Sequence, residues 1–141
     1  MKSKRSPSAS RSTGNLIIDT SALITWVKKG QAEKLVEYSG AKISVVTLFE
    51  FLRGVKSEKG FKRAVKDLTT LFKVVPIDES TSILASELYR KLERGGTPHR
   101  DDGDLLIAAT AIKKGYYLLT YDKGFSKFTK FGLKLYKESK K

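Results

Sequence analysis

Short apolar runs alternate along the chain with longer segments in which apolar residues recur every three or four positions. The apolar runs predict strands over residues 15–19, 41–46, 73–77 and 116–120, and a short edge strand over 132–136. The periodic segments predict helices over residues 20–30, 31–40, 47–55, 60–72, 78–96 and 104–115. Strands that alternate with helices are typical of a parallel sheet covered on both faces. We therefore predict a three-layer α/β/α fold with a central, mainly parallel sheet of four to five strands.

Four acidic residues stand in apolar surroundings. Asp19 follows the run "LII", Glu50 interrupts "VVTLFEFL", Asp104 opens "DLLIAATAI" and Asp122 follows the strand "YYLLT". Ligands of parallel sheets bind outside the carboxyl ends of the strands, where the strand order reverses. Asp19 and Asp122 are expected at that edge, and the helices that carry Glu50 and Asp104 can present their first turns to it. We therefore expect the four carboxylates to lie together.

Each of these acids also has a purely structural explanation. Asp19 could cap the following helix, and Thr47 and Glu50 have the spacing of a capping box. Asp104 could be an acid favoured by the dipole of a first helical turn, and Asp122 an ordinary turn residue. Taken singly, these roles are the commoner ones for such residues.

Taken together, crowded carboxylates indicate a cation. They repel one another unless a positive charge neutralises them, and oxygen ligands suit Mg²⁺ or Mn²⁺. The chain has no cysteine and one histidine, His99, which argues against thiolate zinc sites, cysteine nucleophiles and a Ser-His-Asp triad. His99 is predicted to be a loop residue rather than a catalyst. A divalent ion that activates water for attack on a phosphodiester needs only the acids.

Four segments resemble the successive motifs of PIN-domain ribonucleases: "LIIDTSALI", "SVVTLFEFLRG", "DDGDLLIAATAIKKG" and "YLLTYDKGF". The resemblance covers roughly residues 15–128 and is closest to the VapC-like toxins of toxin–antitoxin pairs. It implies a PIN-like nuclease domain over residues 14–136, a metal-dependent endoribonuclease acting on RNA, and Mg²⁺ or Mn²⁺ as cofactor. It also implies a homodimer and a small antitoxin as partner. The family's catalytic and metal-binding residues fall on Asp19, Glu50, Asp104 and Asp122, with Thr20, Ser21 and Thr120 in support.

Three further residues have two interpretations each. Asp101 and Asp102 stand just ahead of Asp104; they could make an outer contact to the site, but a surface ion pair with Arg100 is the favoured interpretation. Arg53, one turn after Glu50, could pair with that glutamate or bind a substrate phosphate, and the sequence favours neither.

The net charge of +13 lies mainly at the two ends of the chain. Residues 1–13 carry four basic side chains and no acid, and residues 123–141 carry seven lysines against one glutamate. Residues 14–122 hold 17 basic and 14 acidic residues, which is a net charge of only +3. We predict a disordered basic N-terminal tail over residues 1–13 and a basic C-terminal end over 137–141, and such ends attract polyanions, including RNA.

The sequence leaves other functions open. A ribosomal or transfer RNA maturation nuclease would need the same acids, and a catalytically inactive PIN-like module could bind RNA or protein without them. A phosphotransfer receiver domain also places acids at strand ends, but it would need an acid pair near the first strand. No apolar run is long enough to span a bilayer and no secretory signal precedes the first strand, so a cytoplasmic protein without membrane contact is expected.

Overall fold

A single parallel sheet forms the centre of the computed structural model, which describes residues 13–138. Its strands, in chain order, are β1 (Leu16–Ile18), β2 (Lys42–Ser44), β3 (Lys73–Val75), β4 (Tyr117–Leu119) and β5 (Lys134–Leu135). They lie in the order β3-β2-β1-β4-β5, and each neighbouring pair is parallel. The predicted sheet is confirmed, including the edge position of the last strand. The predicted tails lie almost entirely outside the described residues.

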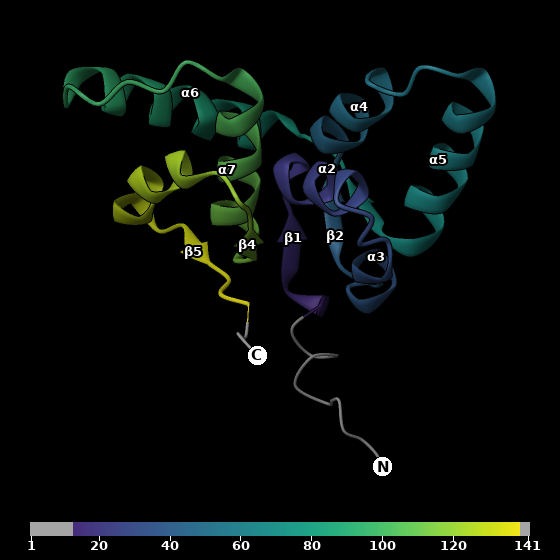
Figure 1. Cartoon of the computed structure of the whole chain (residues 1–141). Coiled ribbons are helices and arrows are strands. Elements are labelled where there is room, and N and C mark those ends of the chain that lie inside the picture. Colours follow the sequence, from purple (N-terminus) through teal and green to yellow (C-terminus); the bar gives the residue numbers. More distant parts are fainter. Residues whose placement is uncertain (1–12, 139–141) are drawn as a thin grey trace, which may run out of the picture.

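Helices cover both faces of this sheet (Figure 1). One core layer joins the sheet to α6 (Glu79–Arg94), α7 (Asp102–Lys114) and the 3₁₀ helix η1 (Lys123–Phe131). The other joins it to α2 (Thr20–Lys28), α3 (Glu33–Glu37), α4 (Val45–Arg53) and α5 (Glu58–Leu71). Because neighbouring strand residues point to opposite faces, Ile17 packs in the first layer while Leu16 and Ile18 pack in the second. The predicted three-layer α/β/α fold is therefore confirmed.

Three helices begin two residues earlier than predicted: α4, α7 and α5, the last of which begins at Glu58 rather than at Gly60. Helix α4 begins at Val45 rather than Thr47, because the buried Ser44 caps it by accepting a hydrogen bond from the backbone N–H of Val46 (3.0 Å). The two valines have strand propensity, and this local signal placed them wrongly in the preceding strand. The capping box suggested for Thr47 and Glu50 is consequently wrong.

Helix α7 begins at Asp102, two residues ahead of its predicted start. Asp101 caps it by accepting a hydrogen bond from the backbone N–H of Asp104 (2.9 Å). The segment after β4, predicted as a loop with a short helical turn, forms the 3₁₀ helix η1. Among residues 13–138, no helix is long and apolar enough to cross a membrane.

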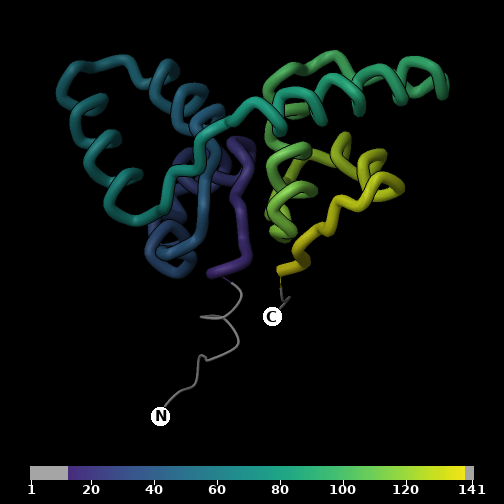
Figure 2. The backbone as a smooth tube through the Cα atoms, turned by 180° about the vertical axis from the view of Figure 1, so that it is seen from behind, coloured from purple at the N-terminus to yellow at the C-terminus, as the bar shows by residue number. Residues whose placement is uncertain are grey.

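The strand order places a switch point between β1 and β4. The chain leaves β1 towards β2 and β3 on one side, and then returns to β4 and β5 on the other. Figure 2 shows the segment after β3 crossing from the half that holds α5 to the half that holds α6. Asp19 follows β1 and Thr120 follows β4, so both stand at the carboxyl end of this switch point.

Candidate active site

Asp19 is buried at the switch point with a hydroxyl cradle around one of its oxygens. Asp19 is 3% exposed, and its Oδ2 atom accepts hydrogen bonds from the hydroxyls of Ser21 (2.8 Å) and Thr120 (2.8 Å). Burial raises the pKa of the Asp19 carboxyl, and these two hydroxyls partly oppose that effect. The carboxylate makes no capping hydrogen bond to α2, although Asp19 occupies the N-cap position. Asp19 thus stands at the start of α2 without a capping hydrogen bond, although the backbone N–H groups of Thr20 and Ser21 also act against the rise in its pKa.

Glu50 reaches the same region from α4. Its Oε1 accepts a hydrogen bond from the hydroxyl of Thr20 (2.6 Å), which also lies 3.1 Å from the buried hydroxyl of Thr47. Its Oε2 lies against Gly103 in the first turn of α7, where a Cβ atom would stand only 2.5 Å from this oxygen. A side chain at position 103 would displace the carboxylate, so glycine lets Glu50 approach the helix that carries Asp104.

Asp104 faces this site and shares its hydrogen bonding with His99. The His99 Nε2 and Asp104 Oδ2 atoms are 2.8 Å apart, and the imidazole packs against Phe128, with ring centroids 5.1 Å apart. Burial raises the pKa of Asp104 to about 6; the His99 contact opposes the rise, and the charges of Asp101 and Asp19 add to it. Asp19 and Asp104 are therefore close enough to repel.

His99 lies in the loop before α7, as predicted, but the sequence-based interpretation missed its contact with Asp104. It does lie between helices, but it is only 8% exposed and directly bonded to a site carboxylate. Its place five residues before Asp104 could have drawn attention to it, because a histidine in the loop that enters α7 can fold back onto the first turn.

Asp122 is attached to the site through its backbone. Its N–H donates to Thr120 Oγ1 (3.0 Å), while its carboxylate caps η1 by accepting a hydrogen bond from the N–H of Gly124 (2.8 Å). The side chain is thus engaged in the turn role that its sequence position allowed. Asp101 likewise caps a helix, and it adds its charge to the field at Asp104.

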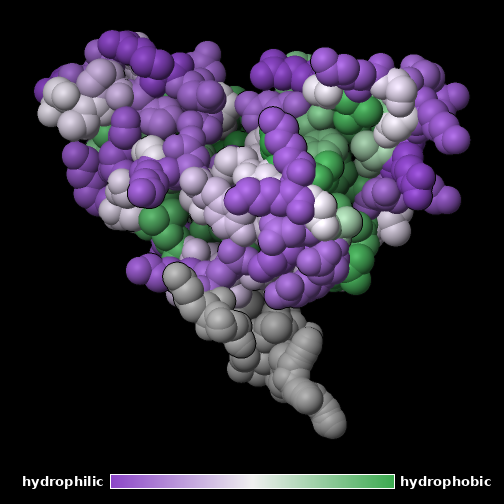
Figure 3. Space-filling view, viewed as in Figure 1, coloured by the Kyte–Doolittle hydropathy of each residue, from purple (hydrophilic) through white to green (hydrophobic). Residues whose placement is uncertain are grey.

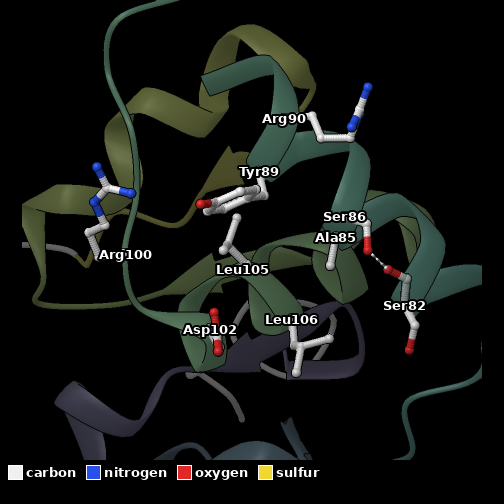
Figure 4. A pocket seen from close by; sticks show the side chains of 9 residues that line it. All are labelled: Ser82, Ala85, Ser86, Tyr89, Arg90, Arg100, Asp102, Leu105 and Leu106. Carbon is white, nitrogen blue, oxygen red and sulfur yellow. Dashed lines mark hydrogen bonds between the residues drawn. The ribbon is translucent and has the colours of Figure 1, made fainter. Parts of the chain in front are cut away.

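The predicted surface pairing with Arg100 is wrong. Arg100 binds Glu93 instead, with 2.6 Å between NH1 and Oε2. Asp102 and Arg100 both line an open groove of about 710 Å³ between α6 and α7 (Figure 4). Its other lining residues are Ser82, Ala85, Ser86, Tyr89, Arg90, Leu105 and Leu106.

Arg53 is exposed, and its guanidinium lies 5.2 Å from the ring centroid of Phe49. No ion pair joins it to Glu50 within residues 13–138. Of its two interpretations, the pairing with Glu50 is therefore absent, and the contact to a substrate phosphate stays a prediction.

The donors at this site suit a hard divalent cation. Asp19 carries a buried charge without a lysine or arginine partner in the described part of the chain, and Asp104 is repelled by its acidic neighbours. Within residues 13–138, no three acidic or histidine side chains are grouped as a ready set of metal ligands. Mg²⁺ does not require such a set, because it retains several waters and is commonly held by one or two carboxylates.

The sequence profile of the PIN domain matches residues 16–130. This chain belongs to the PIN domain family. Ribonuclease VapC1 of Methanocaldococcus jannaschii is 41% identical over 122 residues, which cover 86% of each chain. Ribonuclease VapC1 of Rickettsia felis is 35% identical over 116 residues, covering 74% of this chain and 83% of the relative.

Solved structures of toxin–antitoxin complexes share the fold. A VapBC2 chain from Rickettsia felis, crystallised with a promoter DNA fragment, superposes with a TM-score of 0.69 at 20% identity, covering 88% of this chain and 98% of that one. A VapBC-1 chain from nontypeable Haemophilus influenzae gives a TM-score of 0.69 at 22% identity, with 86% and 96% covered. The expected PIN-like architecture is confirmed over nearly the whole described chain.

Proposed function

We propose that this PIN-domain protein is a metal-dependent endoribonuclease and the toxin of a toxin–antitoxin pair. The observation that carries the proposal is the buried Asp19 carboxylate, held at the switch point by two hydroxyls and close to Asp104, with no ion pair to a lysine or arginine of residues 13–138. Relatives named ribonucleases, which share up to 41% identity, support the reaction class. The nuclease domain spans residues 14–136.

Asp19 and Asp104 would hold Mg²⁺ or Mn²⁺, with Glu50 and Asp122 completing the acidic set. When bound, the ion polarises a phosphoryl oxygen and lowers the pKa of a water that attacks the phosphodiester. The chain's own contribution is to fix the carboxylates. Three hydroxyls do so: those of Ser21 and Thr120 orient Asp19, and that of Thr20 orients Glu50.

His99 is a positioning residue in this scheme, since it holds Asp104 Oδ2 and thereby sets the direction of the other carboxylate oxygen. Asp101 acts on the site through the cap of α7 rather than as a ligand. Arg53 is proposed to bind a phosphate of the RNA next to the cleaved bond. It is exposed one turn after Glu50, and stacking on Phe49 restricts its motion.

An antitoxin is the proposed protein partner, because the structures of similar fold are VapBC complexes. Hydrophobic surface suited to such a partner lies in a hollow right of centre in Figure 3, between α2 and α5. Phe49 on α4 and Val36 on α3 are 60% and 64% exposed. Exposed apolar surface that is contiguous, as in this hollow, marks an interaction site on a monomer. A homodimer is part of the same proposal.

Two alternatives share the fold. A maturation nuclease for ribosomal or transfer RNA would use the same carboxylates and would lack an antitoxin. An inactive RNA- or protein-binding module would not need the hydroxyl cradle around Asp19, and the intact cradle favours catalysis.

The proposal is tested by cleavage of a mixed-sequence RNA with purified protein. Mg²⁺ or Mn²⁺ should support internal cleavage, excess chelator should abolish it, and added metal should restore it. Asp19→Asn should lose at least about a hundredfold in rate, on the order of 3 kcal/mol of transition-state stabilisation. The exposed Asp67→Asn on α5 is the matched control and should cleave normally. Full activity in chelator, or in Asp19→Asn, would refute the mechanism.

A further inference from the structure

The candidate active site is a poor place for this protein to hold RNA. Its surroundings are acidic: Asp19, Glu50, Asp101, Asp104 and Asp122 all lie at or beside the carboxyl edge of the sheet. A bound divalent ion would neutralise only part of that charge. RNA binds mainly through its phosphates, so the affinity must come from positive charge elsewhere on the molecule.

Lysines gather at the opposite, amino edge of the sheet. Strands β2, β3 and β5 each begin with a lysine, and helix α7 ends in two more before Gly115 turns the chain into β4. Lys42 and Lys73 are register partners on neighbouring strands, whereas Lys134 lies at the other side of the sheet, where its register partner is Tyr117. We call this surface the basic amino edge and define it as Lys42, Lys73, Lys113, Lys114 and Lys134.

Two of these lysines are held in place by aromatic rings. The Lys134 Nζ atom lies 4.5 Å from the ring centroid of Tyr117, and the Lys42 Nζ atom lies 5.2 Å from that of Tyr116. Lys42 also donates a hydrogen bond to the carbonyl of Gly14 (2.6 Å). Such contacts restrict the lysine rotamers, which lowers the entropy that binding a phosphate would cost.

None of the five lysines of the basic amino edge forms an ion pair within residues 13–138, and the nearest acidic influence is at Lys114, whose charge helps to lower the pKa of the Asp78 carboxyl. The helix dipole explains lysines at the end of α7. It does not explain those at the starts of strands, because sheets have only small net dipoles. Lysines also protect exposed sheet edges from pairing, which accounts for Lys73 and Lys134 on the edge strands β3 and β5 but not for Lys42 on the interior strand β2.

We propose that the basic amino edge is a second RNA-binding surface, which holds phosphates of the substrate away from the cleaved bond. The proposal rests on the nuclease function proposed above and names its substrate class. Helix α7 joins the two surfaces, and its 13 residues span roughly 20 Å at about 1.5 Å each. A folded RNA can contact both ends, whereas an oligonucleotide of a few residues bound at the site cannot.

The test compares two variants with equal loss of charge. The amino-edge variant replaces four exposed lysines by glutamine: Lys73, Lys113, Lys114 and Lys134. The control variant replaces four exposed lysines on or beside α5: Lys56, Lys59, Lys62 and Lys66. Lys42 is left intact because its hydrogen bond to Gly14 supports the start of β1. Thermal unfolding of both variants checks that the fold is retained.

Binding is measured in chelator by fluorescence anisotropy across a salt series, with a folded RNA of about 30 nucleotides and with a pentanucleotide. The amino-edge variant should bind the folded RNA at least tenfold more weakly, and its log–log salt slope should fall by about 2–3, since each lost phosphate contact removes about 0.7–0.9. The control variant should change the slope by less than about 1. With metal added, the amino-edge variant should cleave the pentanucleotide at the normal rate.

Equal losses in the two variants would overturn the proposal, because affinity would then follow net charge alone. Unchanged binding of the folded RNA by the amino-edge variant would also overturn it. A duplex DNA is measured in the same salt series, and a loss confined to this DNA would overturn the proposal and assign the surface to DNA. The binding arm uses no catalysis, so it can succeed even if the protein cleaves nothing. A failure of the nuclease proposal is thereby distinguishable from a failure of this one.

Discussion

Replacing Asp104 by asparagine should stabilise the metal-free protein while abolishing cleavage. Burial and the charges of Asp101 and Asp19 raise the pKa of Asp104 from 3.8 to about 6. A raised pKa means that ionisation of this carboxyl opposes folding at neutral pH. Asparagine removes the charge and keeps a similar shape. It also leaves the cap of α7 intact, because Asp101 provides that cap.

The expected gain in folding stability follows from the shift in the pKa of Asp104. A rise of roughly two units corresponds to at most about 3 kcal/mol of destabilisation above pH 6. Asp104 is only partly buried, so solvent screening reduces this to about 1–2 kcal/mol. For a domain of this size the variant should unfold about 3–6 °C higher at pH 7.5 in chelator.

The gain in stability of Asp104→Asn should depend on pH in one direction. The unfolded chain loses its Asp104 proton near pH 3.8 and the folded chain near pH 6, so stability falls between these values as pH rises. The advantage of Asp104→Asn should therefore be full above pH 6 and should shrink to roughly a fifth of that by pH 4.

Thermal and urea unfolding from pH 4 to pH 8 measure this gain, and cleavage is measured in parallel with Mg²⁺. The cleavage rate should fall by at least about a hundredfold. Asp67→Asn, at an exposed position on α5, is the control and should change neither quantity. A variant that is less stable at pH 7.5, or whose gain persists undiminished at pH 4, would refute the assignment of a strained, half-buried charge to Asp104.

Three further changes test separate parts of the structure. His99→Ala removes the partner of Asp104 Oδ2 and should weaken Mg²⁺ binding about 10–100-fold by isothermal calorimetry; unchanged affinity would exclude a positioning role. Gly103→Ala places a Cβ 2.5 Å from Glu50 Oε2 and should lower cleavage at least about tenfold, whereas Gly54→Ala, with its nearest contact at 3.5 Å, should not. Deletion of residues 2–12 removes four basic side chains and should reduce the slope of log affinity for RNA against log salt concentration by up to about 3. If the full chain and the deletion variant give equal slopes, that segment has another role.

The alternation of elements could be predicted from the sequence because its signals are local. Fully apolar runs such as Leu16–Ile18 mark strands buried on both faces, and periodic apolar residues with glycine stops mark helices. Parallel topology then placed Asp19 and Thr120 at one edge without knowledge of any contact. The same locality misled the prediction at Val45 and Val46, where the cap from Ser44 outweighed strand propensity.

Only the tertiary structure decided which polar atoms meet. The contact of His99 with Asp104, the approach of Glu50 to Gly103 and the pairing of Arg100 with Glu93 depend on side-chain directions across different elements. The spacing of residues along the chain does not specify such directions. The basic amino edge is of the same kind: three of its lysines begin strands and two end α7, and only the fold brings these distant segments to one edge of the sheet. Sequence thus determined where the carboxylates could gather, and packing decided which neighbours hold them and where the balancing positive charge lies.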